Sequence, residues 1–488
     1  MPAVFLGSIK GGNDMAVSYQ ILSSYNAIDD AAASALLAEE LAANHCKIVV
    51  LDDDPTGTQT VHDITVYTDW DKASILDGFR SGDKVFYILT NSRGFTREET
   101  VKVHREIAHN LNEVSEETGI DYMLVSRSDS TLRGHFPLET ETLRDVIEQE
   151  SPKRFDGEII CPYFREGGRF TFNNIHYVKY GDELVPACET EFAKDKTFGY
   201  SAYTMPEYVE EKTGGAFRAE DVVCISIEEI RSMDFDGITA KLRSVSGFGK
   251  IIVNAIDDSD LRVFCTAMYR AMKAGKSFIF RTAASIVKVM GGITDHPLLT
   301  REKMVSCESA NGGVIVVGSH TAKTTAQVEC LREIGDIDFI ELDATLVRDE
   351  DAFEKEIARC LAAEKESILA GRTVCCYTTR ALITADTGNK EDELRLSVRI
   401  SDAVQSLVGR LDVTPAFVIA KGGITSSDVA KKALGIRKAL VLGQIRPGIP
   451  VWQAGGESKF PGIPYIVFPG NVGEQTTLRE AAEILMSD

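Results

Sequence analysis

Short apolar runs rich in β-branched residues alternate with longer amphipathic stretches along the chain. This alternation is typical of β-α-β units, in which buried parallel strands are connected by helices. In the first half, strands are predicted over residues 47–51, 64–67, 85–89, 122–125, 158–161, 222–225, 251–255 and 278–280. Helices are predicted over residues 30–43, 97–117, 138–149, 227–245 and 260–274. The first half is therefore expected to form an α/β domain.

One long segment of this half lacks any sustained period. Residues 165–215 are rich in glycine, aromatic and charged side chains, and the pattern predicts an extended loop there. A loop of this length is uncommon in a compact protein unless it serves a site.

The pattern changes between residues 282 and 312, where glycines cluster and Pro297 occurs. The strand signal then restarts, with strands predicted over residues 314–317, 339–342, 373–377, 416–420, 439–442 and 465–468. Helices are predicted over residues 323–334, 351–370, 393–409 and 474–486. We therefore expect two α/β domains with mainly parallel sheets, covering residues 1–285 and 310–488, and an active site in the cleft between them.

Composition and charge narrow the class of protein. The 488 residues are 44% hydrophobic and 26% charged, which is typical of a folded globular chain. The net charge of −21 disfavours nucleic acid as a partner, because a phosphate backbone is repelled. Neither a run of about 18 apolar residues nor a signal-peptide pattern is visible, and the ten cysteines are scattered. The chain is expected to be cytoplasmic, with no membrane partner.

The first predicted strand ends in an acidic loop, residues 52–60. In open α/β sheets, ligands bind outside the carboxyl ends of the strands. Asp53 and Asp54 are followed by the small residues Thr56 and Gly57. Such a loop can supply a general base for a substrate hydroxyl and oxygen ligands for a divalent cation. The alternative is a solvated acidic turn without a catalytic role.

A second polar loop, residues 126–135, follows the fourth predicted strand. The loop contains two arginines, the second of which is Arg133, and their planar guanidinium groups match the geometry of a carboxylate. Asp129 and Ser130 can bind sugar hydroxyls. Asn91 and Arg93 end the third strand in the same way. The combination suits a polyhydroxy acid. In the alternative interpretation, the arginines pair with acids at the surface.

Three glycine-containing loops lie between strands and helices of the second half. We call them glycine loop 1 (residues 318–321), glycine loop 2 (422–425) and glycine loop 3 (470–473). Backbone amides at such junctions, with the positive end of a helix dipole, favour an anion. The P-loop, G-x-G-x-x-G, G-x-S-x-G and H-E-x-x-H patterns are absent, so a nucleotide site here would not be of the Walker or Rossmann type.

Taken in order, these loops resemble the four-carbon acid sugar kinases. The motifs are Asp53-Asp54-Pro55-Thr56-Gly57, Asp129-Ser130-Thr131-Leu132-Arg133-Gly134, Gly318-Ser319-His320-Thr321 with Gln327, Gly422-Gly423-Ile424-Thr425 and Gly470-Asn471-Val472-Gly473. The resemblance implies a sugar-acid-binding domain followed by a nucleotide-binding domain, and phosphorylation of threonate, erythronate or an oxo-tetronate by ATP. Two positions depart from the family pattern, since Thr321 replaces a common serine and Ile424 a frequent glutamate.

The resemblance implies a role for each candidate residue. Asp53 or Asp54 would act as the base, with Mg²⁺ bridging the phosphates of ATP. The expected substrate-binding residues are Thr56, Gly57, Asn91, Arg93, Asp129, Ser130 and Arg133. The expected ATP-binding residues are Ser319, Thr321, Gly422, Gly423, Ile424, Thr425, Gly470 and Gly473.

Two other function classes stay open at this point. One is an NAD-dependent or isomerising sugar-acid enzyme, which NAD dependence would identify. The other is a non-catalytic sugar-acid-binding protein, which would bind its ligand without forming ADP. Besides a sugar acid and ATP, a second copy of the chain is a candidate partner.

Overall fold

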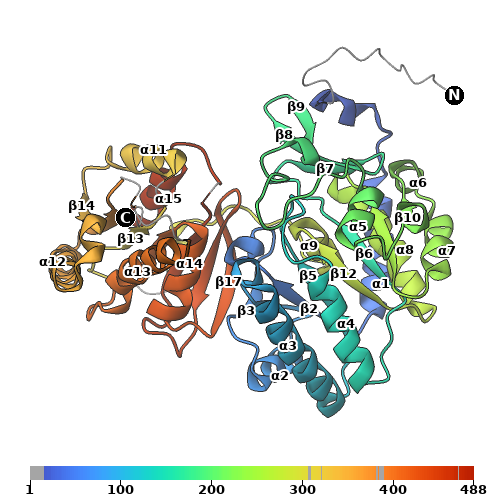
Figure 1. Ribbon diagram of the computed structural model, residues 1–488, viewed down its shortest axis with the longest axis horizontal. Helices are drawn as coiled ribbons and strands as arrows, with labels where there is room; N and C mark the ends of the chain where they lie inside the picture. Colours follow the sequence, from blue (N-terminus) through green and yellow to red (C-terminus); the bar gives the residue numbers. More distant parts are fainter. Residues whose placement is uncertain are drawn as a thin grey trace. The chain divides into compact units, whose positions relative to one another are not determined.

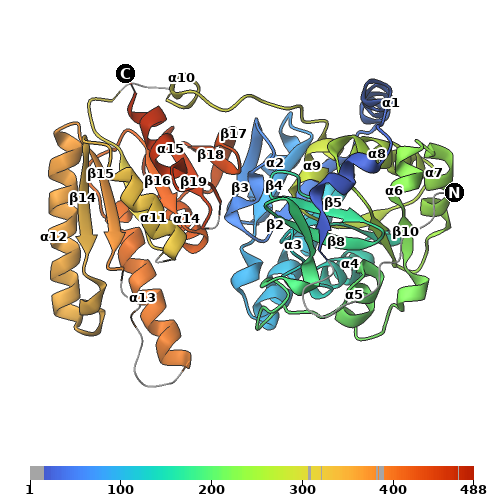
Figure 2. The same ribbon diagram turned by 90° about the horizontal axis from the view of Figure 1, so that it is seen from above.

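The chain forms two compact α/β units. The computed structural model describes residues 16–305, 309–319, 321–380, 383, 390–470 and 472–487. Unit 1 comprises residues 1–46, 96–112 and 123–292, and unit 2 comprises residues 47–95, 113–122 and 293–488. Figure 1 shows the elements coloured along the sequence, and Figure 2 shows them from above. A mixed α/β fold with mostly parallel strands is confirmed.

The main sheet of unit 1 is parallel, with strand order β10-β11-β6-β12-β5. Its strands are β5 (Tyr122–Arg127), β6 (Gly157–Cys161), β10 (Val223–Ile225), β11 (Gly249–Val253) and β12 (Phe278–Thr282). Its helices are α1 (Asp30–Ala43), α4 (Leu138–Glu150), α5 (Met205–Lys212), α6 (Ile227–Arg231), α7 (Phe235–Ser244), α8 (Asp258–Lys273) and α9 (Ala284–Gly291), and α3 (Arg97–Thr118) is shared with unit 2. Helix α8 packs against α1, α7 and α9 and is mostly buried.

Two predictions for unit 1 are wrong. The helix expected over residues 227–245 is two helices, α6 and α7, separated by Met233, whose φ is +55°. The segment expected to be a loop instead holds α5 and three strands, β7, β8 and β9, which form an antiparallel sheet with β1 from the N-terminal region in the order β1-β9-β8-β7. Its strands are β1 (Val17–Ser18), β7 (Arg169–Phe172), β8 (Ile175–Tyr180) and β9 (Glu183–Pro186). The strands are short and follow one another through tight turns, which hides their period in the sequence.

Unit 2 is built on strands in the order β2-β4-β3-β17-β18-β19-β16-β13-β15-β14. The strands are β2 (Lys47–Asp52), β3 (Ile64–Tyr67), β4 (Val85–Leu89), β13 (Val314–Val317), β14 (Ile337–Leu342), β15 (Thr373–Thr378), β16 (Val418–Lys421), β17 (Lys438–Arg446), β18 (Ile449–Ala454) and β19 (Pro464–Phe468). The helices are α2 (Lys72–Arg80), α10 (Arg301–Met304), α11 (Ala322–Leu331), α12 (Glu350–Leu369), α13 (Lys390–Gly409), α14 (Gly423–Asp428) and α15 (Thr477–Met486).

The pairing of β3 with β17 explains the composition of unit 2. Strand β17 pairs antiparallel with β3 on one side and with β18 on the other, and β18 pairs antiparallel with β19. Strands from the two halves of the sequence therefore share one unit. The predicted domain limits of 1–285 and 310–488 stay a prediction.

Strand β13, which pairs parallel with β15 and β16, lies in the buried part of the C-terminal strands. All four residues of β13 are buried, and Ile315 and Val317 pack with α11 and α15 in one apolar cluster. Figure 1 shows α12 and α13 at the other side of these strands from α11. A strand covered on both faces reads as a continuous apolar run, which is why this one was predictable.

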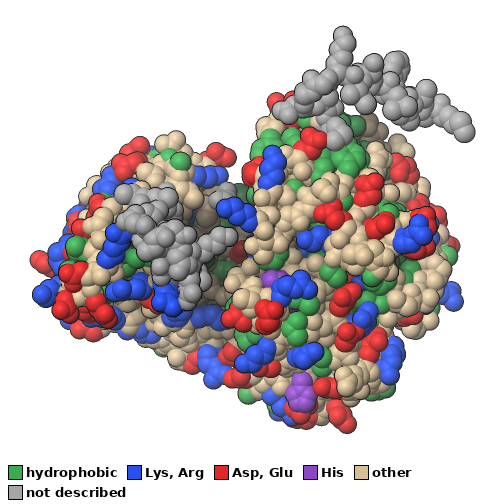
Figure 3. Space-filling view, viewed as in Figure 1, with side chains coloured by type: hydrophobic (Ala, Val, Ile, Leu, Met, Phe, Trp, Pro, Cys, Tyr) green, Lys and Arg blue, Asp and Glu red, His purple; other side chains and the backbone are tan. Residues whose placement is uncertain are grey.

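Three general findings concern the surface, the helices and the cysteines. On the face shown in Figure 3, acidic and basic side chains are interspersed instead of forming one patch. Within the part of the chain that the structure describes, no helix is long and apolar enough to span a membrane. The nine cysteines in the described ranges are all free thiols.

Candidate functional site

Strand β2 positions the acidic loop. All six residues of β2 are buried, and the chain then turns into the short 3-10 helix η2 (Pro55–Thr58). Asp54 caps this helix, because its Oδ1 accepts hydrogen bonds from the Thr56 amide at 2.8 Å and the Thr56 hydroxyl at 2.6 Å. Asp53 is only 4% exposed. The acidic loop is therefore ordered by hydrogen bonds and largely buried, and it is not a solvated acidic turn.

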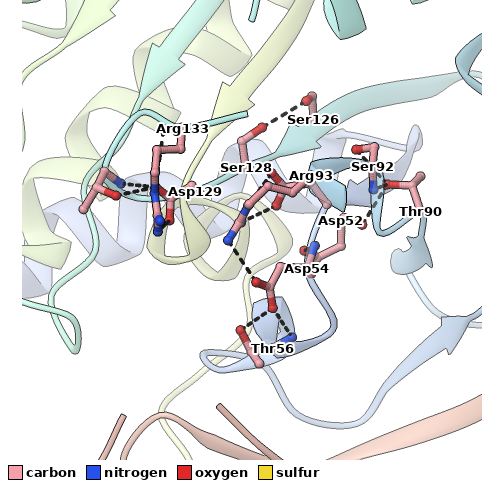
Figure 4. A network of polar contacts seen from close by, with 12 residues as sticks. Asp52, Asp54, Thr56, Thr90, Ser92, Arg93, Ser126, Ser128, Asp129 and Arg133 are labelled. Carbon is pink, nitrogen blue, oxygen red and sulfur yellow. Dashed lines mark hydrogen bonds and ion pairs between the residues drawn. The ribbon is translucent and has the colours of Figure 1, made fainter. Parts of the chain in front are cut away.

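Arg93 holds the two candidate catalytic aspartates next to each other. It lies in the 3-10 helix η3 (Ser92–Gly94), which follows β4. Its Nε and Nη2 donate to Asp53 at 3.1 and 2.6 Å, and its Nη1 donates to Asp54 at 2.9 Å, as Figure 4 shows for Asp54. One guanidinium thereby offsets part of the repulsion between two neighbouring carboxylates.

Gly57 is required by the packing of the acidic loop. A Cβ atom at this position would lie 1.8 Å from Oδ2 of Asp52. The Asp52 carbonyl in turn accepts hydrogen bonds from the amide and hydroxyl of Thr90, both at 2.9 Å. The glycine of the motif therefore lets η2 pack on the end of β2. Substrate binding by Thr56 and Gly57 stays a prediction.

Two contacts within unit 2 connect the ends of β2 and β4 with the C-terminal part of the sequence. Asn91, which has a left-handed backbone with φ of 58°, donates from Nδ2 to the hydroxyl of Ser427 in α14. Trp452 in β18 donates from Nε1 to the hydroxyl of Thr58 at 3.0 Å. The first of these contacts joins Asn91 to the helix that begins in glycine loop 2. Sequence reasoning found Asn91 but missed Ser427 and Trp452, whose residue types carry no chemical signal by themselves.

The three glycine loops come together at one end of the C-terminal strands. A Cβ at Gly318 would lie 2.3 Å from Oγ1 of Thr425, and a Cβ at Gly422 would lie 3.5 Å from Cβ of Ser319. A Cβ at Gly470 would lie 4.0 Å from the amide nitrogen of Gly423. Loops that are far apart in the sequence are thus in contact, as an anion site made of backbone amides requires. His320 and Asn471 lie outside the described residues.

Side chains hold each glycine loop in place. Thr321 caps α11 through its hydroxyl, which accepts from the Thr324 amide at 3.3 Å. Gln327 of α11 donates to the Glu474 carbonyl at 2.9 Å, just after glycine loop 3. Arg380, which sequence reasoning missed, donates to the Ser319 carbonyl at 2.8 Å. In glycine loop 3, Gly473 has a φ of 84°, a left-handed backbone conformation that favours glycine.

Lys421 connects glycine loops 2 and 3. Its side chain is fully buried, and Nζ donates to the carbonyls of Pro469 at 2.6 Å and Gly470 at 3.0 Å. Burial, with a smaller effect from Lys323, lowers the pKa of Lys421 to about 7. A neutral amine keeps two N–H donors, so both hydrogen bonds can persist after deprotonation. The sequence did contain a signal for Lys421, because a lysine at the end of an apolar strand is unusual enough to mark a candidate residue.

We expect the Lys421→Met substitution to change how stability depends on pH. The pKa of Lys421 is about 7 when folded and about 10.4 when unfolded, so between these values the unfolded chain binds the proton more tightly. Raising the pH through this window therefore stabilises the wild-type fold, by up to about 1.4 kcal/mol per pH unit, relative to the variant. Urea unfolding at pH 7, 8 and 9 measures this difference. Both tryptophans, Trp70 and Trp452, lie in unit 2 and report on it by fluorescence. A constant difference across that range would contradict the expectation.

The predicted loop after β5 is also an organised structure, and it lies in unit 1. Arg133 forms a two-point ion pair with Asp129, with Nε at 2.8 Å and Nη2 at 3.1 Å, as Figure 4 shows. The Asp129 carboxylate also accepts from the backbone amides of Thr131 at 3.2 Å and Arg133 at 3.3 Å. Asp129 therefore supports the loop in addition to any contact with a sugar hydroxyl.

A buried histidine supports Ser130. His176 of β8 donates from Nε2 to the Ser130 carbonyl at 2.7 Å, and its Nδ1 lies 2.9 Å from the Thr171 hydroxyl. Burial lowers the pKa of His176 to about 4, so the imidazole is neutral near pH 7. With Nε2 protonated, Nδ1 is left to accept from Thr171. Sequence reasoning missed this residue because it lies in the segment expected to be a loop.

Arg281 was missed as well, although it interrupts the apolar strand β12. Its Nη1 donates to the Ser128 hydroxyl at 2.5 Å, and its Nη2 donates to the Arg133 carbonyl at 3.2 Å. It also lies 3.6 Å from Glu139. A charged residue inside a buried strand was the signal that could have identified it.

The structure divides the predicted site residues into two clusters. The unit 1 cluster contains Asp129, Ser130 and Arg133. The unit 2 cluster contains Asp53, Asp54, Thr56, Gly57, Asn91, Arg93, Ser319, Thr321, Gly422, Gly423, Ile424, Thr425, Gly470 and Gly473. The described ranges hold no group of three or more His, Cys, Asp or Glu side chains arranged to bind a metal.

Comparisons with known proteins identify the two domains that carry these clusters. The model of a sugar-binding N-terminal domain matches residues 48–290, and that of a nucleotide-binding C-terminal domain matches residues 314–478. No curated protein matches the chain.

Two solved structures have a similar fold. A Haemophilus influenzae protein of the DUF1537 family is 19% identical, with a TM-score of 0.60 over 90% of this chain and 100% of that one. A Salmonella typhimurium LT2 protein, provisionally named a tRNA synthase, is 16% identical, with a TM-score of 0.63 over 89% of this chain and 98% of that one. At these identities, the likeness shows the shared fold. Through its two matched domains, the chain belongs to the four-carbon acid sugar kinase family.

Proposed function

We propose that the protein is an ATP-dependent kinase that phosphorylates a hydroxyl group of a small sugar acid, such as threonate, erythronate or an oxo-tetronate. A sugar-binding and a nucleotide-binding domain fit this activity. The observation that carries the proposal is the hydrogen bond from Asn91 to Ser427 within unit 2. It connects the segment after β4, whose Arg93 contacts Asp53 and Asp54 of the acidic loop, with the helix that begins in glycine loop 2.

The acidic loop supplies the groups that act on the acceptor hydroxyl. One carboxylate of Asp53 and Asp54 accepts the hydroxyl proton as phosphoryl transfer proceeds. Arg93 keeps the two groups in fixed orientations, because it donates to both. Phosphoryl transfer depends mainly on positioning and charge stabilisation, so a rigid loop of this kind is suited to it.

The glycine loops hold the triphosphate of ATP through backbone amides and hydroxyl groups. The side chain of Ile424 is 74% exposed, so it does not take part in the packing that joins the loops. Thr425 remains available beside Gly318 and Gly422. The loss of the frequent glutamate at position 424 therefore leaves the amide-based part of this binding mode intact.

Mg²⁺ would bind at the carboxylates of Asp53 and Asp54. Magnesium in such sites is commonly held by one or two carboxylates together with substrate phosphates, and a pair of adjacent acids fits that requirement. The ion supplies charge neutralisation for the transferred phosphoryl group. The assignment of Mg²⁺ to these residues is part of the proposal.

The proposal predicts ADP release that depends on an acid. The full chain, with ATP and Mg²⁺, is incubated with threonate, erythronate and their oxo forms, and ADP is followed by a coupled assay. We expect turnover with at least one acid and little with threitol, which has hydroxyls but no carboxylate. ³¹P spectra of the product then identify the phosphorylated hydroxyl.

Two outcomes would replace this proposal with another function. NAD reduction without ADP formation would indicate a dehydrogenase. Tight binding of an acid, with no ADP from any member of the panel, would indicate a binding protein. Inactivity with every acid and no acid binding would reject a sugar-acid function altogether.

A further inference from the structure

Arg169 lies at the start of β7, next to the unit 1 cluster. A tight turn fixes its backbone, since the Phe164 and Arg169 amides each donate to the other residue's carbonyl, at 3.1 and 2.8 Å. Gly168 within this turn has a φ of 71°, and a Cβ there would lie 2.9 Å from Cβ of Lys179. The close packing of this turn therefore determines where the Arg169 side chain begins.

Two guanidinium groups converge on one aromatic ring in this region. The guanidinium carbon of Arg169 lies 5.4 Å from the ring centroid of Phe192, and that of Arg133 lies 5.1 Å from it. Phe192 comes from the segment after β9, which sequence reasoning expected to be a loop. The ring can act as an apolar wall for a ligand held by the two cations.

One edge of the Arg169 guanidinium has no partner in the described residues. Nη1 donates to the Gly167 carbonyl, whereas Nε is buried without a hydrogen-bond partner, and Nη2 makes no hydrogen bond within the described part of the chain. Burial lowers the pKa of Arg169, while Asp129 has the opposite effect. An arginine stays charged in proteins, so this edge is a cationic fork that can accept an anion. Nε and Nη2 form the edge of an arginine that binds a carboxylate at two points.

Two other arginines of the candidate site, Arg93 and Arg133, are already paired with acids. Arg93 donates to Asp53 and Asp54, and Arg133 donates to Asp129 through two nitrogens. Among the described residues, no carboxylate lies within 4.0 Å of the Arg169 guanidinium. The ligand is the remaining source of a carboxylate for Arg169.

We propose that Arg169 binds the carboxylate of the sugar acid through its Nε and Nη2 edge, beside Phe192 and Arg133. This inference rests on the proposed function for the class of ligand. It assigns acid recognition to a residue of the β7–β9 segment, and it leaves Arg133 to organise the loop after β5. Arg169 then determines specificity for an acid over a neutral polyol.

Binding measurements on the full chain test this assignment. Calorimetry compares threonate and erythronate with threonamide, the neutral amide of the same skeleton, for wild type, Arg169→Gln and Arg169→Lys. We expect Arg169→Gln to weaken binding of the acid by about 10- to 100-fold, as for a lost charge-assisted hydrogen bond, and to leave threonamide binding unchanged. Arg169→Lys keeps the charge but not the fork, so an intermediate loss is expected.

Arg165→Gln is the matched control in the same turn. The Arg165 side chain is 60% exposed and pairs with Asp257 at 3.5 Å, so its replacement should leave acid binding unchanged. Thermal unfolding of each variant checks that the chain is folded. Equal losses for acid and amide would indicate a purely structural role and would overturn the proposal.

The two proposals fail in different ways. If wild type forms ADP and the KM for the acid is unchanged in Arg169→Gln, Arg169 is not the anchor, while the kinase function stands. If wild type binds acids without forming ADP and Arg169→Gln loses that binding, the anchor stands and the kinase function fails. If wild type binds no acid of the panel, both are rejected.

Discussion

Replacing the catalytic aspartate of the acidic loop by asparagine should lower kcat by about 10²- to 10⁴-fold, the usual contribution of a general base. Asparagine has nearly the same shape as aspartate but cannot accept the proton of the substrate hydroxyl. Asp53→Asn and Asp54→Asn are compared, because Arg93 contacts both carboxylates. The base is the residue whose replacement gives the larger loss at saturating substrate, measured as ADP release.

ATP affinity separates a catalytic effect from a disturbed nucleotide site. Since the glycine loops are held by their own contacts, including those of Lys421 and Gln327, calorimetry without Mg²⁺, whose proposed ligands are these two carboxylates, should show ATP binding within about twofold of wild type. Asp63→Asn is the matched control, because Asp63 follows the acidic loop, is 73% exposed and has a φ of 52° that asparagine tolerates. Normal rates in both Asp53→Asn and Asp54→Asn would remove the pair from catalysis.

The position of the candidate chemistry was largely predictable because strand ends are readable from the sequence. The apolar run of β2 indicated where the strand ends, and the aspartates at and after its end, Asp52, Asp53 and Asp54, therefore had to lie at a carboxyl end of the sheet. The same reasoning located Arg93 after β4 and Asp129 after β5. Each of these statements needs only local hydrophobicity and the rule for parallel sheets.

Contacts between distant segments were not predictable in this way. Asn91 and Ser427 are 336 positions apart, and Thr58 and Trp452 are 394 positions apart. Both contacts depend on the pairing of β3 with β17, which brings together strands from opposite halves of the chain. The local pattern of apolar and polar residues does not indicate which two edge strands will pair.

The missed sheet of unit 1 did have a usable signal. Asn173 and Asn174 have φ values of 51° and 59°, as in a type I′ turn, and they connect β7 with β8. Two asparagines between short aromatic runs are a hairpin pattern, but the flanking strands are too short to show a clear period of two. Recognising that turn would have placed Arg169 and His176 on strands.

Lys250→Met is expected to destabilise unit 1 by about 3–5 kcal/mol, because it leaves a buried carboxylate without its counter-ion. Lys250 of β11 and Glu158 of β6 are register partners on neighbouring strands, and Nζ lies 2.5 Å from Oε2 with neither side chain exposed. Phe217 and Phe248 surround the ammonium, with ring centroids 4.4 and 3.9 Å away. Water cannot reach this site to solvate the Glu158 carboxylate in place of Lys250. The substitution therefore destabilises the folded state. Hydrogen exchange of the β6 and β11 amides measures the free energy of opening in this unit.

The double variant Lys250→Met/Glu158→Met determines whether the cost comes from the unpaired charge. If it does, replacing both partners by apolar side chains of similar length should recover most of the lost stability, because no buried ion remains. Lys241→Met is the matched control in the same unit, since Lys241 pairs with Glu229 at 2.6 Å but is 44% exposed, and its loss should cost at most about 1 kcal/mol. A double variant as unstable as the sum of the two single ones would mean that packing, and not the buried charge, makes this pair essential. Strand β6, which carries Glu158, is a neighbour of β12, which bears Arg281. Loss of the pair should therefore also loosen the loop that Arg281 holds through Ser128.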